Sequence, residues 1–175
     1  MISLGLDVST TVTGVALLDG DKPAVLEPII LDKCKGLWPK VDAARAHLTD
    51  LKCRHPQVDH IFIEEPLKNF SSGLSSADTI ISLVRFNGIV SFICRDLWRL
   101  DPTYINASHA RKLVGVKVQR TAVAGKPAKQ QTFEHMMNGE LSHVVWPTKK
   151  SGKTVDWAPD VVDAYVVARA GVIEL

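Results

Sequence analysis

Cysteine is scarce in this sequence, and its spacing excludes two classes of small protein. Cys34, Cys53 and Cys94 are odd in number, lie far apart and form no paired CxxC motif. A secreted disulfide framework and a structural zinc site both require paired or closely spaced thiols. We therefore expect a protein of a reducing compartment, the cytoplasm.

No leader-like pattern is expected at the start of the chain, and a long uninterrupted apolar run is missing as well. The stretch MISLGLDVS enters a strand-like pattern without a basic leader, an apolar signal core or a small-residue cleavage site. The longest apolar stretch, Thr79 to Cys94, is interrupted by Arg85 and Asn87. It is predicted to be a buried helix rather than a membrane span. We expect neither secretion nor a membrane partner.

A strong excess of one charge is absent too. The formal net charge is only +2, which neither requires nor excludes a nucleic acid, so the distribution of charge matters more than its sum. Apolar residues make up 46% and charged residues 23%, a balance typical of globular proteins. A chain of 175 residues can bury roughly 70% of its surface. We expect a single domain over residues 1–175.

Two periodicities divide the chain into strands and helices. Strands are predicted at Ile2–Val8, Gly14–Leu18, Ala24–Leu31, His60–Glu64 and Thr103–Asn106. Helices are predicted at Pro39–Leu51, Ser76–Arg99, Ser108–Val114, Pro127–Asn138 and Pro159–Ala170. This order indicates an α/β fold, a mixed five-stranded sheet flanked by helices, in which the first three strands form an antiparallel meander.

The helix predicted at Ser76–Arg99 is apolar on more than one face. Apolar residues on more than one face imply that this helix packs against something besides a single sheet. Two explanations stay open at this point, a dimer interface and ordinary core packing.

The last predicted helix begins with two acids on one side. In APDVVDAYVVA, Asp160 and Asp163 are three residues apart and therefore neighbours on the helix surface. Acids in a first turn interact favourably with the helix dipole, by roughly 0.3 to 1 kcal/mol each, and Pro159 suits the first helical position. Taken alone, the pair is explained by helix initiation.

Further acids follow two predicted strands. Asp7 ends the first strand, and Glu64 and Glu65 end IFIEEP. Singly, each has an ordinary explanation, because a strand-terminal Asp accepts turn hydrogen bonds and one of two adjacent glutamates usually faces water. Together with the helical pair they predict one acidic cleft, in which carboxylates about 4 Å apart repel by roughly 1 to 4 kcal/mol per pair. A divalent cation bound among these carboxylates would turn their net repulsion into a net attraction.

The predicted ligands are all oxygens, without His or Cys. Such a set favours Mg²⁺, with Mn²⁺ as a substitute, over zinc. Mg²⁺ held by carboxylates typically meets phosphate oxygens, and two ions roughly 3.5 to 4 Å apart can activate a water and stabilise the leaving oxygen of a phosphodiester. The pattern therefore predicts hydrolytic phosphoryl transfer.

Basic residues gather in two segments of this nearly neutral chain. They are Arg111, Lys112, Lys117, Arg120, Lys126 and Lys129, followed by Lys149, Lys150 and Lys153. This distribution favours a surface that tracks phosphates beside the acidic cleft, and a plain solvated loop is the alternative. Aromatic residues are sparse here, which favours recognition of a duplex backbone over stacking on single-stranded bases.

The ordered set of motifs resembles a known family. LGLDVSTTVTGVAL, IFIEEP and APDVVDAYVVA, with SSADTIISLVRFNGIVSFI and KPAKQQTFEHMM between them, are similar to the Holliday junction resolvases of the RuvC type, within the RNase H-like nuclease superfamily. The resemblance spans nearly the whole chain. It implies an RNase H-like fold and a Mg²⁺-dependent crossover junction endodeoxyribonuclease. It also implies a homodimer that nicks two strands of a four-way DNA junction.

The resemblance also implies roles for single residues. Asp7, Glu64, Asp160 and Asp163 match the four metal-binding carboxylates of the family, and Glu64 is preferred over Glu65 because it directly follows the apolar strand. Lys129 resembles a lysine that stabilises charge on the phosphate, and Lys112 is a weaker match to a second lysine.

Two departures concern the substrate. The stretch from Lys112 to Lys129 is longer than in the bacterial enzymes, and residues 146–157 form an added basic hairpin or loop. Both changes resemble phage-encoded members, so we expect a bacterial or phage-infected cell. They leave open a broader nuclease acting on flaps, forks or RNA–DNA hybrids.

Two alternatives belong to other classes. LDVSTTVTG also resembles the phosphate loop of actin-like sugar and acetate kinases, although that fold needs about twice this length and a second glycine-rich motif, and ATP binding would identify it. An inactive DNA-binding module is the other, and the presence of all four matching acids argues against it.

Overall fold

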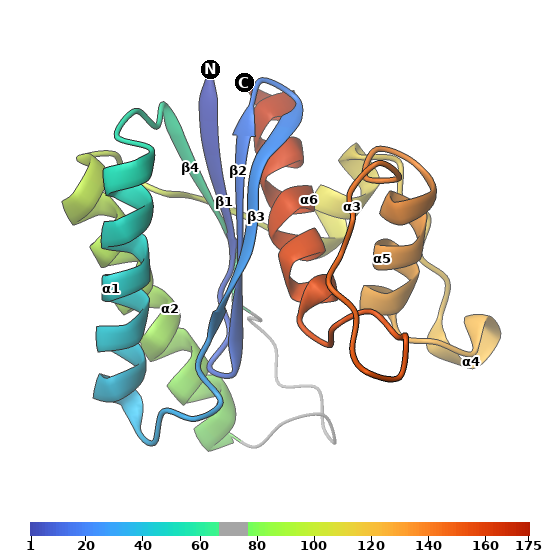
Figure 1. Ribbon diagram of the computed structural model, residues 1–175, viewed down its shortest axis with the longest axis horizontal. Coiled ribbons are helices and arrows are strands. Elements are labelled where there is room, and N and C mark those ends of the chain that lie inside the picture. The colour runs from blue at the N-terminus through green and yellow to red at the C-terminus, as the bar shows by residue number, and fades with distance from the viewer. Residues whose placement is uncertain (67–76) are drawn as a thin grey trace.

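The computed structural model describes residues 1–66 and 77–175, which form one mixed sheet between two layers of helices (Figure 1). The strands are β1 (Ile2–Asp7), β2 (Val12–Asp19), β3 (Lys22–Ile30), β4 (His60–Glu64) and β5 (Thr103–Ile105). The helices are α1 (Leu37–Arg54), α2 (Ala77–Trp98), α3 (Ala107–Leu113), α4 (Thr121–Ala124), α5 (Ala128–Asn138) and α6 (Ala158–Glu174). The predicted fold class is confirmed.

The sheet has the order β3-β2-β1-β4-β5. The first three strands form the predicted antiparallel meander, while β1 pairs in parallel with β4 and β4 in parallel with β5. Because Leu6 lies beside Ile63 in the parallel register, β1 and β4 end at the same edge of the sheet. Asp7 and Glu64, the next residues, are therefore neighbours.

Two apolar cores lie on the two faces of the sheet. Helices α1 and α2 cover one face, and α3, α5 and α6 cover the other (Figure 1). The buried positions of α1 are the four apolar residues whose helical spacing predicted the helix, Val41, Ala44, Leu48 and Leu51. Burial of one side chain of this kind is worth roughly 1.5 to 3 kcal/mol, so the stripe fixes α1 against the sheet.

Two strand glycines let α6 approach the sheet closely. A Cβ atom on Gly14 would lie 2.1 Å from the carbonyl oxygen of Asp160, and one on Gly5 would lie 2.3 Å from that of Ala164. Both obstacles are backbone atoms of α6, which cannot turn away as a side chain can. The absence of side chains at these two positions therefore sets how near the acids of α6 come to β1.

Helix α2 is apolar on two sides, as predicted. Phe86, Val90 and Ile93 are buried in the core, whereas Val84 and Phe92 are exposed. It is the one helix of the described residues that is long and apolar enough to cross a membrane by length and composition, which is weak evidence because core helices pass the same test. The predicted start at residue 76 lies outside the described residues.

Most predicted elements differ from the structure only at their ends. The short helix α4 was not predicted, because its four residues contain no apolar period and no buried side chain. Residues 146–157 form a hairpin-like loop in which Thr148 bridges Thr154 and Gly152 adopts a positive φ of 78°. The expectation of a hairpin or loop is confirmed.

Candidate metal centre

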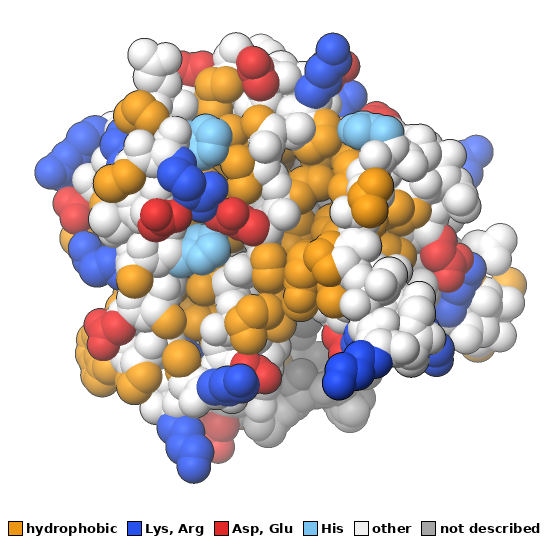
Figure 2. Space-filling view, viewed as in Figure 1, with side chains coloured by type: hydrophobic (Ala, Val, Ile, Leu, Met, Phe, Trp, Pro, Cys, Tyr) orange, Lys and Arg blue, Asp and Glu red, His pale blue; other side chains and the backbone are white. Residues whose placement is uncertain are grey.

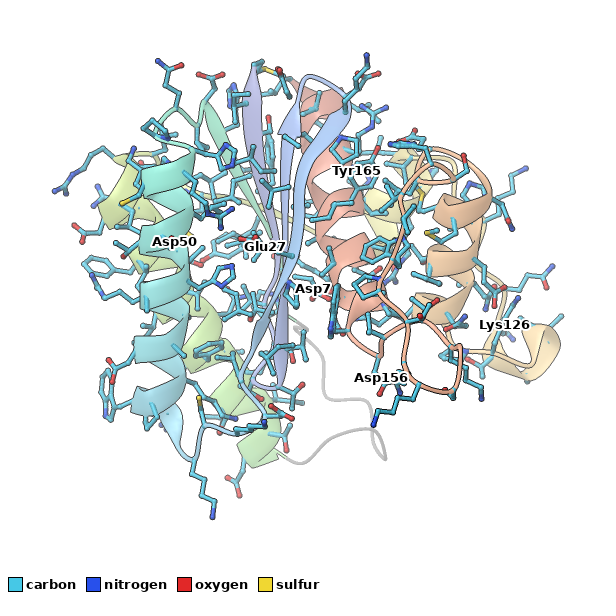
Figure 3. The ribbon with its side chains drawn as sticks, in the orientation of Figure 1. Asp7, Glu27, Asp50, Lys126, Asp156 and Tyr165 are labelled. Atoms are coloured by element: carbon cyan, nitrogen blue, oxygen red, sulfur yellow. The ribbon has the colours of Figure 1, made fainter. Side chains whose placement is uncertain are left out.

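Three carboxylates from three elements converge at one edge of the sheet. Asp7 comes from the end of β1, Glu64 from the end of β4 and Asp163 from the second turn of α6. One oxygen of each lies within 4.8 Å of the others, and we call these three residues the acidic triad. Figure 3 shows Asp7 between the sheet and the first turns of α6. Glu64, preferred over Glu65 from the sequence, is the member from β4.

Lys129, at the start of α5, places its ammonium group among the acids. Its Nζ lies 2.9 Å from Asp7 Oδ2, 2.7 Å from Asp160 Oδ1 and 3.4 Å from Asp163 Oδ2. Asp160 thus joins the centre through Lys129 and is not a member of the triad. The structure brings all four predicted acids and the predicted lysine together, and their roles as ligands stay predictions.

Arg111, on α3, also contacts the triad. Its Nη2 donates to Asp163 Oδ1 over 3.3 Å, and its side chain is only 16% exposed. Its Nε is buried and has no hydrogen-bond partner among the described residues. The sequence predicted Arg111 as a DNA-binding residue, which stays a prediction, but did not reveal this ion pair because the partners are 52 positions apart.

Burial raises the pKa values of all three members of the triad, and neighbouring acids add to the rise for Asp7 and Glu64. Burial, followed by the charges of Asp7 and Asp163, raises the pKa of Glu64 to about 8, against the lowering effect of Arg111 and Lys129. Burial also raises the pKa of Asp7 to about 6, although Lys129 opposes it, and raises that of Asp163. Glu64 therefore retains its proton near neutral pH unless more positive charge is supplied.

The pKa of Lys129 moves in the complementary direction. Burial alone would lower the pKa of this ammonium, but the charges of Asp7, Asp163 and Asp160 outweigh burial and raise it above the ordinary value. Lys129 is therefore charged at any physiological pH. Two cations, Arg111 and Lys129, already stand beside the acids, but together they do not bring the pKa of Glu64 to its ordinary range.

A polar chain from α2 supports the β4 end of the centre. Asn87 Nδ2 donates to the carbonyl oxygen of Glu64 over 3.3 Å, and Ser91 Oγ donates to the carbonyl oxygen of Asn87 over 2.8 Å. Tyr104 in turn donates its hydroxyl to Ser91 over 2.7 Å. Sequence reasoning noted Asn87 only as an interruption of an apolar helix. A polar amide inside such an apolar helix is the signal that could have pointed to a contact of this kind.

The predicted DNA-binding residues are spread over the rim of this half of the molecule. Lys126 pairs with Glu134, and Lys149 pairs with Asp156 at 2.5 Å. Figure 3 places Lys126 at α4 and α5, away from Asp7. The other exposed predicted residues are Lys112, Lys117, Arg120, Lys150 and Lys153. On the face seen in Figure 2, hydrophobic side chains gather in the middle, several basic side chains lie toward the edge, and one basic group lies among acidic and histidine side chains in the left half.

A pocket of about 380 Å³ adjoins the centre on the side of α3. Its lining includes Arg111, Gln119 and Arg120, with Val116 among its apolar residues. Arg111 lines this pocket and also contacts Asp163, so the pocket adjoins the acidic triad. A cationic and amide-bearing pocket of this kind can hold a phosphate-containing group.

The donor set of the triad fits a hard divalent cation. Carboxylate oxygens are the ligands that Mg²⁺ and Mn²⁺ prefer, and the triad contains neither His nor Cys, which zinc favours. Two members lie at strand ends and one on a helix, so the backbone holds all three in place.

Comparison with known proteins reveals the same fold in Holliday junction resolvases. No protein-family model and no curated protein matches the sequence. Thermus thermophilus RuvC in complex with a Holliday junction substrate superposes with a TM-score of 0.67 at 12% identity, over 99% of this chain and 93% of that one. A second T. thermophilus RuvC structure gives 0.62 at 13% identity, over 99% and 94%.

A eukaryotic structure extends the comparison. The yeast mitochondrial Holliday junction resolvase gives a TM-score of 0.58 at 12% identity, over 98% of this chain and 77% of that one. In all three comparisons the alignment covers 98–99% of this chain. The chain therefore has the RuvC-type, RNase H-like fold over nearly its whole length.

Proposed function

We propose that this protein is a Mg²⁺-dependent endodeoxyribonuclease that resolves four-way DNA junctions and related branched DNA. The observation that carries the proposal is the convergence of Asp7, Glu64 and Asp163 in a fold shared with junction resolvases. Fold alone does not fix chemistry, so the acidic triad, with Asp7 and Asp163 buried, is the decisive support. The cytoplasm of a bacterial or phage-infected cell is the proposed location.

The residues of the centre divide the work between them. Asp7, Glu64 and Asp163 would hold the divalent ion, and Asp160, one turn from Asp163, would complete its surroundings. When bound, such an ion supplies Lewis acidity toward a phosphodiester oxygen and activates a water. Lys129 would place its positive charge where negative charge develops on the phosphate.

The basic residues would hold the DNA. The exposed cations of the 111–126 stretch and of the 146–157 loop lie on the same half of the molecule as the triad, as Figure 1 shows for the elements that carry them. Contacts to phosphates position a duplex without reading its sequence. We propose that the pocket beside Arg111 contributes to binding of the strand next to the cleaved bond.

A homodimer is part of the proposal. Paired nicks across a junction require two centres, and the described residues of one chain contain one acidic triad. The outer side of α2 supports a symmetric contact, because Ile81, Val84 and Phe92 are exposed there. Apart from the adjacent residues and backbone of α2 itself, no atom of residues 1–66 and 77–175 lies within 4 Å of where a Cβ atom would stand on Gly88. Phe92→Asp should convert the dimer to a monomer in light scattering and convert paired nicks to single nicks.

The deciding experiment uses a labelled mobile four-way junction. Purified protein is incubated with the junction with and without Mg²⁺, and the nicks are mapped. Symmetric nicks that require Mg²⁺ are expected, and Asp7→Asn should abolish cutting while junction binding survives. The matched control is Asp50→Asn, an exposed acid on α1, which should cut normally. Full activity of Asp7→Asn would contradict the proposed centre.

Other branched substrates distinguish the broader alternative. Flaps, replication forks and RNA–DNA hybrids are assayed at the same protein concentration. Faster cutting of any of these than of the four-way junction would favour a general structure-selective nuclease. The kinase alternative is not favoured, since the three similar structures described above are resolvases and align with 98–99% of this chain.

A further inference from the structure

The ammonium group of Lys129 binds the carboxylates that a metal ion would use. Its ammonium contacts Asp7 Oδ2 and Asp163 Oδ2, and both residues belong to the acidic triad. A third contact, to Asp160 Oδ1, is the shortest at 2.7 Å. In this structure the positive charge within the centre is therefore supplied by the chain itself.

The lysine can leave while its helix stays in place. Helix α5 is anchored by Thr132 and Met136, which are buried, and Thr132 Oγ1 donates to the carbonyl oxygen of Ala128. Lys129 itself is 37% exposed, and its ammonium sits on a flexible four-carbon stem. Removal of the ammonium from the acids thus requires rotations of one side chain and no displacement of α5.

Arg111 provides a contrast within the same centre. It contacts Asp163 through Oδ1, whereas Lys129 contacts Asp163 through Oδ2. The Arg111 side chain is mostly buried, and its guanidinium is rigid and planar. The two cations therefore differ in mobility: Arg111 holds one oxygen of Asp163 in a fixed orientation, and Lys129 covers the other.

We propose that Lys129 is an exchangeable internal cation, which neutralises the acids in the metal-free protein and withdraws when a divalent ion binds. The inference rests on the proposed function in one respect, that the triad takes such an ion. A lysine ammonium and a divalent cation that share Asp7 and Asp163 repel each other at short range. The entering ion must therefore displace the ammonium, and this competition weakens metal binding.

DNA should relieve the competition. Once displaced, the ammonium needs a new anionic partner, and a phosphate oxygen at the mouth of the centre can provide one. The ion and the DNA then favour each other's binding, by the reciprocity of linked equilibria. This linkage should depend on Lys129 and be lost when its charge is removed.

The test is Mn²⁺ binding to the DNA-free protein, followed by the electron paramagnetic resonance signal of the free ion. Lys129→Gln should bind Mn²⁺ at least about tenfold more tightly than the wild type, and Lys129→Arg, which keeps the charge, should not. The matched control is Lys126→Gln, three residues away in sequence and paired with Glu134, which should leave the affinity unchanged. Equal or weaker binding by Lys129→Gln overturns the exchange.

The outcomes separate this inference from the proposed function. If the wild type binds Mn²⁺ and cuts junctions but Lys129→Gln binds no more tightly, only the exchange is refuted. If neither protein binds Mn²⁺, both ideas are refuted. Circular dichroism follows folding in the same samples: a Lys129→Gln protein that folds only with Mn²⁺ supports the exchange, and one that folds at no Mn²⁺ concentration overturns it.

Discussion

The close approach of α6 to β2 can be tested by a single added methyl group. In Gly14→Ala, the new Cβ would lie 2.1 Å from the carbonyl oxygen of Asp160 and 2.9 Å from the backbone nitrogen of Val161. Ordinary contact begins near 3.4 Å, so the first turn of α6 must retreat by more than 1 Å. Asp160 and Asp163 would move with it, away from Asp7.

Two magnitudes follow from this displacement. Overpacking of this kind costs typically 1 to 3 kcal/mol, and for a domain of this size each kcal/mol lowers the melting temperature by roughly 2 to 4 °C. A displacement of about 1 Å in a catalytic arrangement can cost on the order of a hundredfold in rate. We therefore expect Gly14→Ala to remain folded at 25 °C but to cut a four-way junction about a hundredfold more slowly.

Gly171→Ala is the matched control. Its Cβ would meet the ring of Phe62 at 2.3 Å, so it also overpacks the interface between α6 and the sheet. The site lies eleven residues beyond Asp160, roughly 16 Å along the helix at 1.5 Å per residue. A similar loss of melting temperature with near-normal cutting is expected. Should Gly14→Ala cut as fast as the wild type, the close approach would not be what positions the acids.

Three further predictions concern the surroundings of the triad. The pKa of Glu64 is raised to about 8 and that of Asp7 to about 6, so the metal-free folded state binds more protons than the unfolded chain. The free energy of unfolding, measured by urea titration, should therefore be greatest near pH 4 and fall as the pH rises toward 8. A flat profile would contradict these shifts. Asn87→Leu removes the donor to the carbonyl oxygen of Glu64, so it should lower stability by about 1 to 3 kcal/mol and weaken Mn²⁺ binding. Unchanged Mn²⁺ affinity would show that this contact does not position Glu64. Lys150→Gln with Lys153→Gln should weaken junction binding and reduce its salt dependence by about one unit of slope per lysine that contacts phosphate, whereas an unchanged slope would remove the 146–157 loop from the DNA surface.

Local patterns were enough to predict most of the secondary structure. The alternation of HIFIE gave β4 with its observed bounds, and the helical spacing from Val41 to Leu51 gave the buried face of α1. These periods are properties of neighbouring residues, so a linear sequence records them. Helix α4 has no periodic apolar pattern and no buried side chain, so the sequence did not predict it.

The positions of the acids were likewise predictable, because carboxylates at strand ends and at a helix start are visible in sequence. That these acids form one metal-binding cleft was a hypothesis, supported by the order of the motifs. What the sequence could not specify was the contact of each acid: Asp163 with Arg111, or Asp160 with Lys129. Several partners were available to each.

The sequence by itself thus determined most of the elements, the class of fold and the acidic character of the centre, since these follow from periodicity and from side-chain chemistry. Tertiary structure alone decided that Lys129 stands among Asp7, Asp160 and Asp163, 122 positions from the first of them. That arrangement depends on the parallel register of β1 and β4 and on the glycines that admit α6. Such contacts arise from the packing of whole elements, which no local pattern encodes.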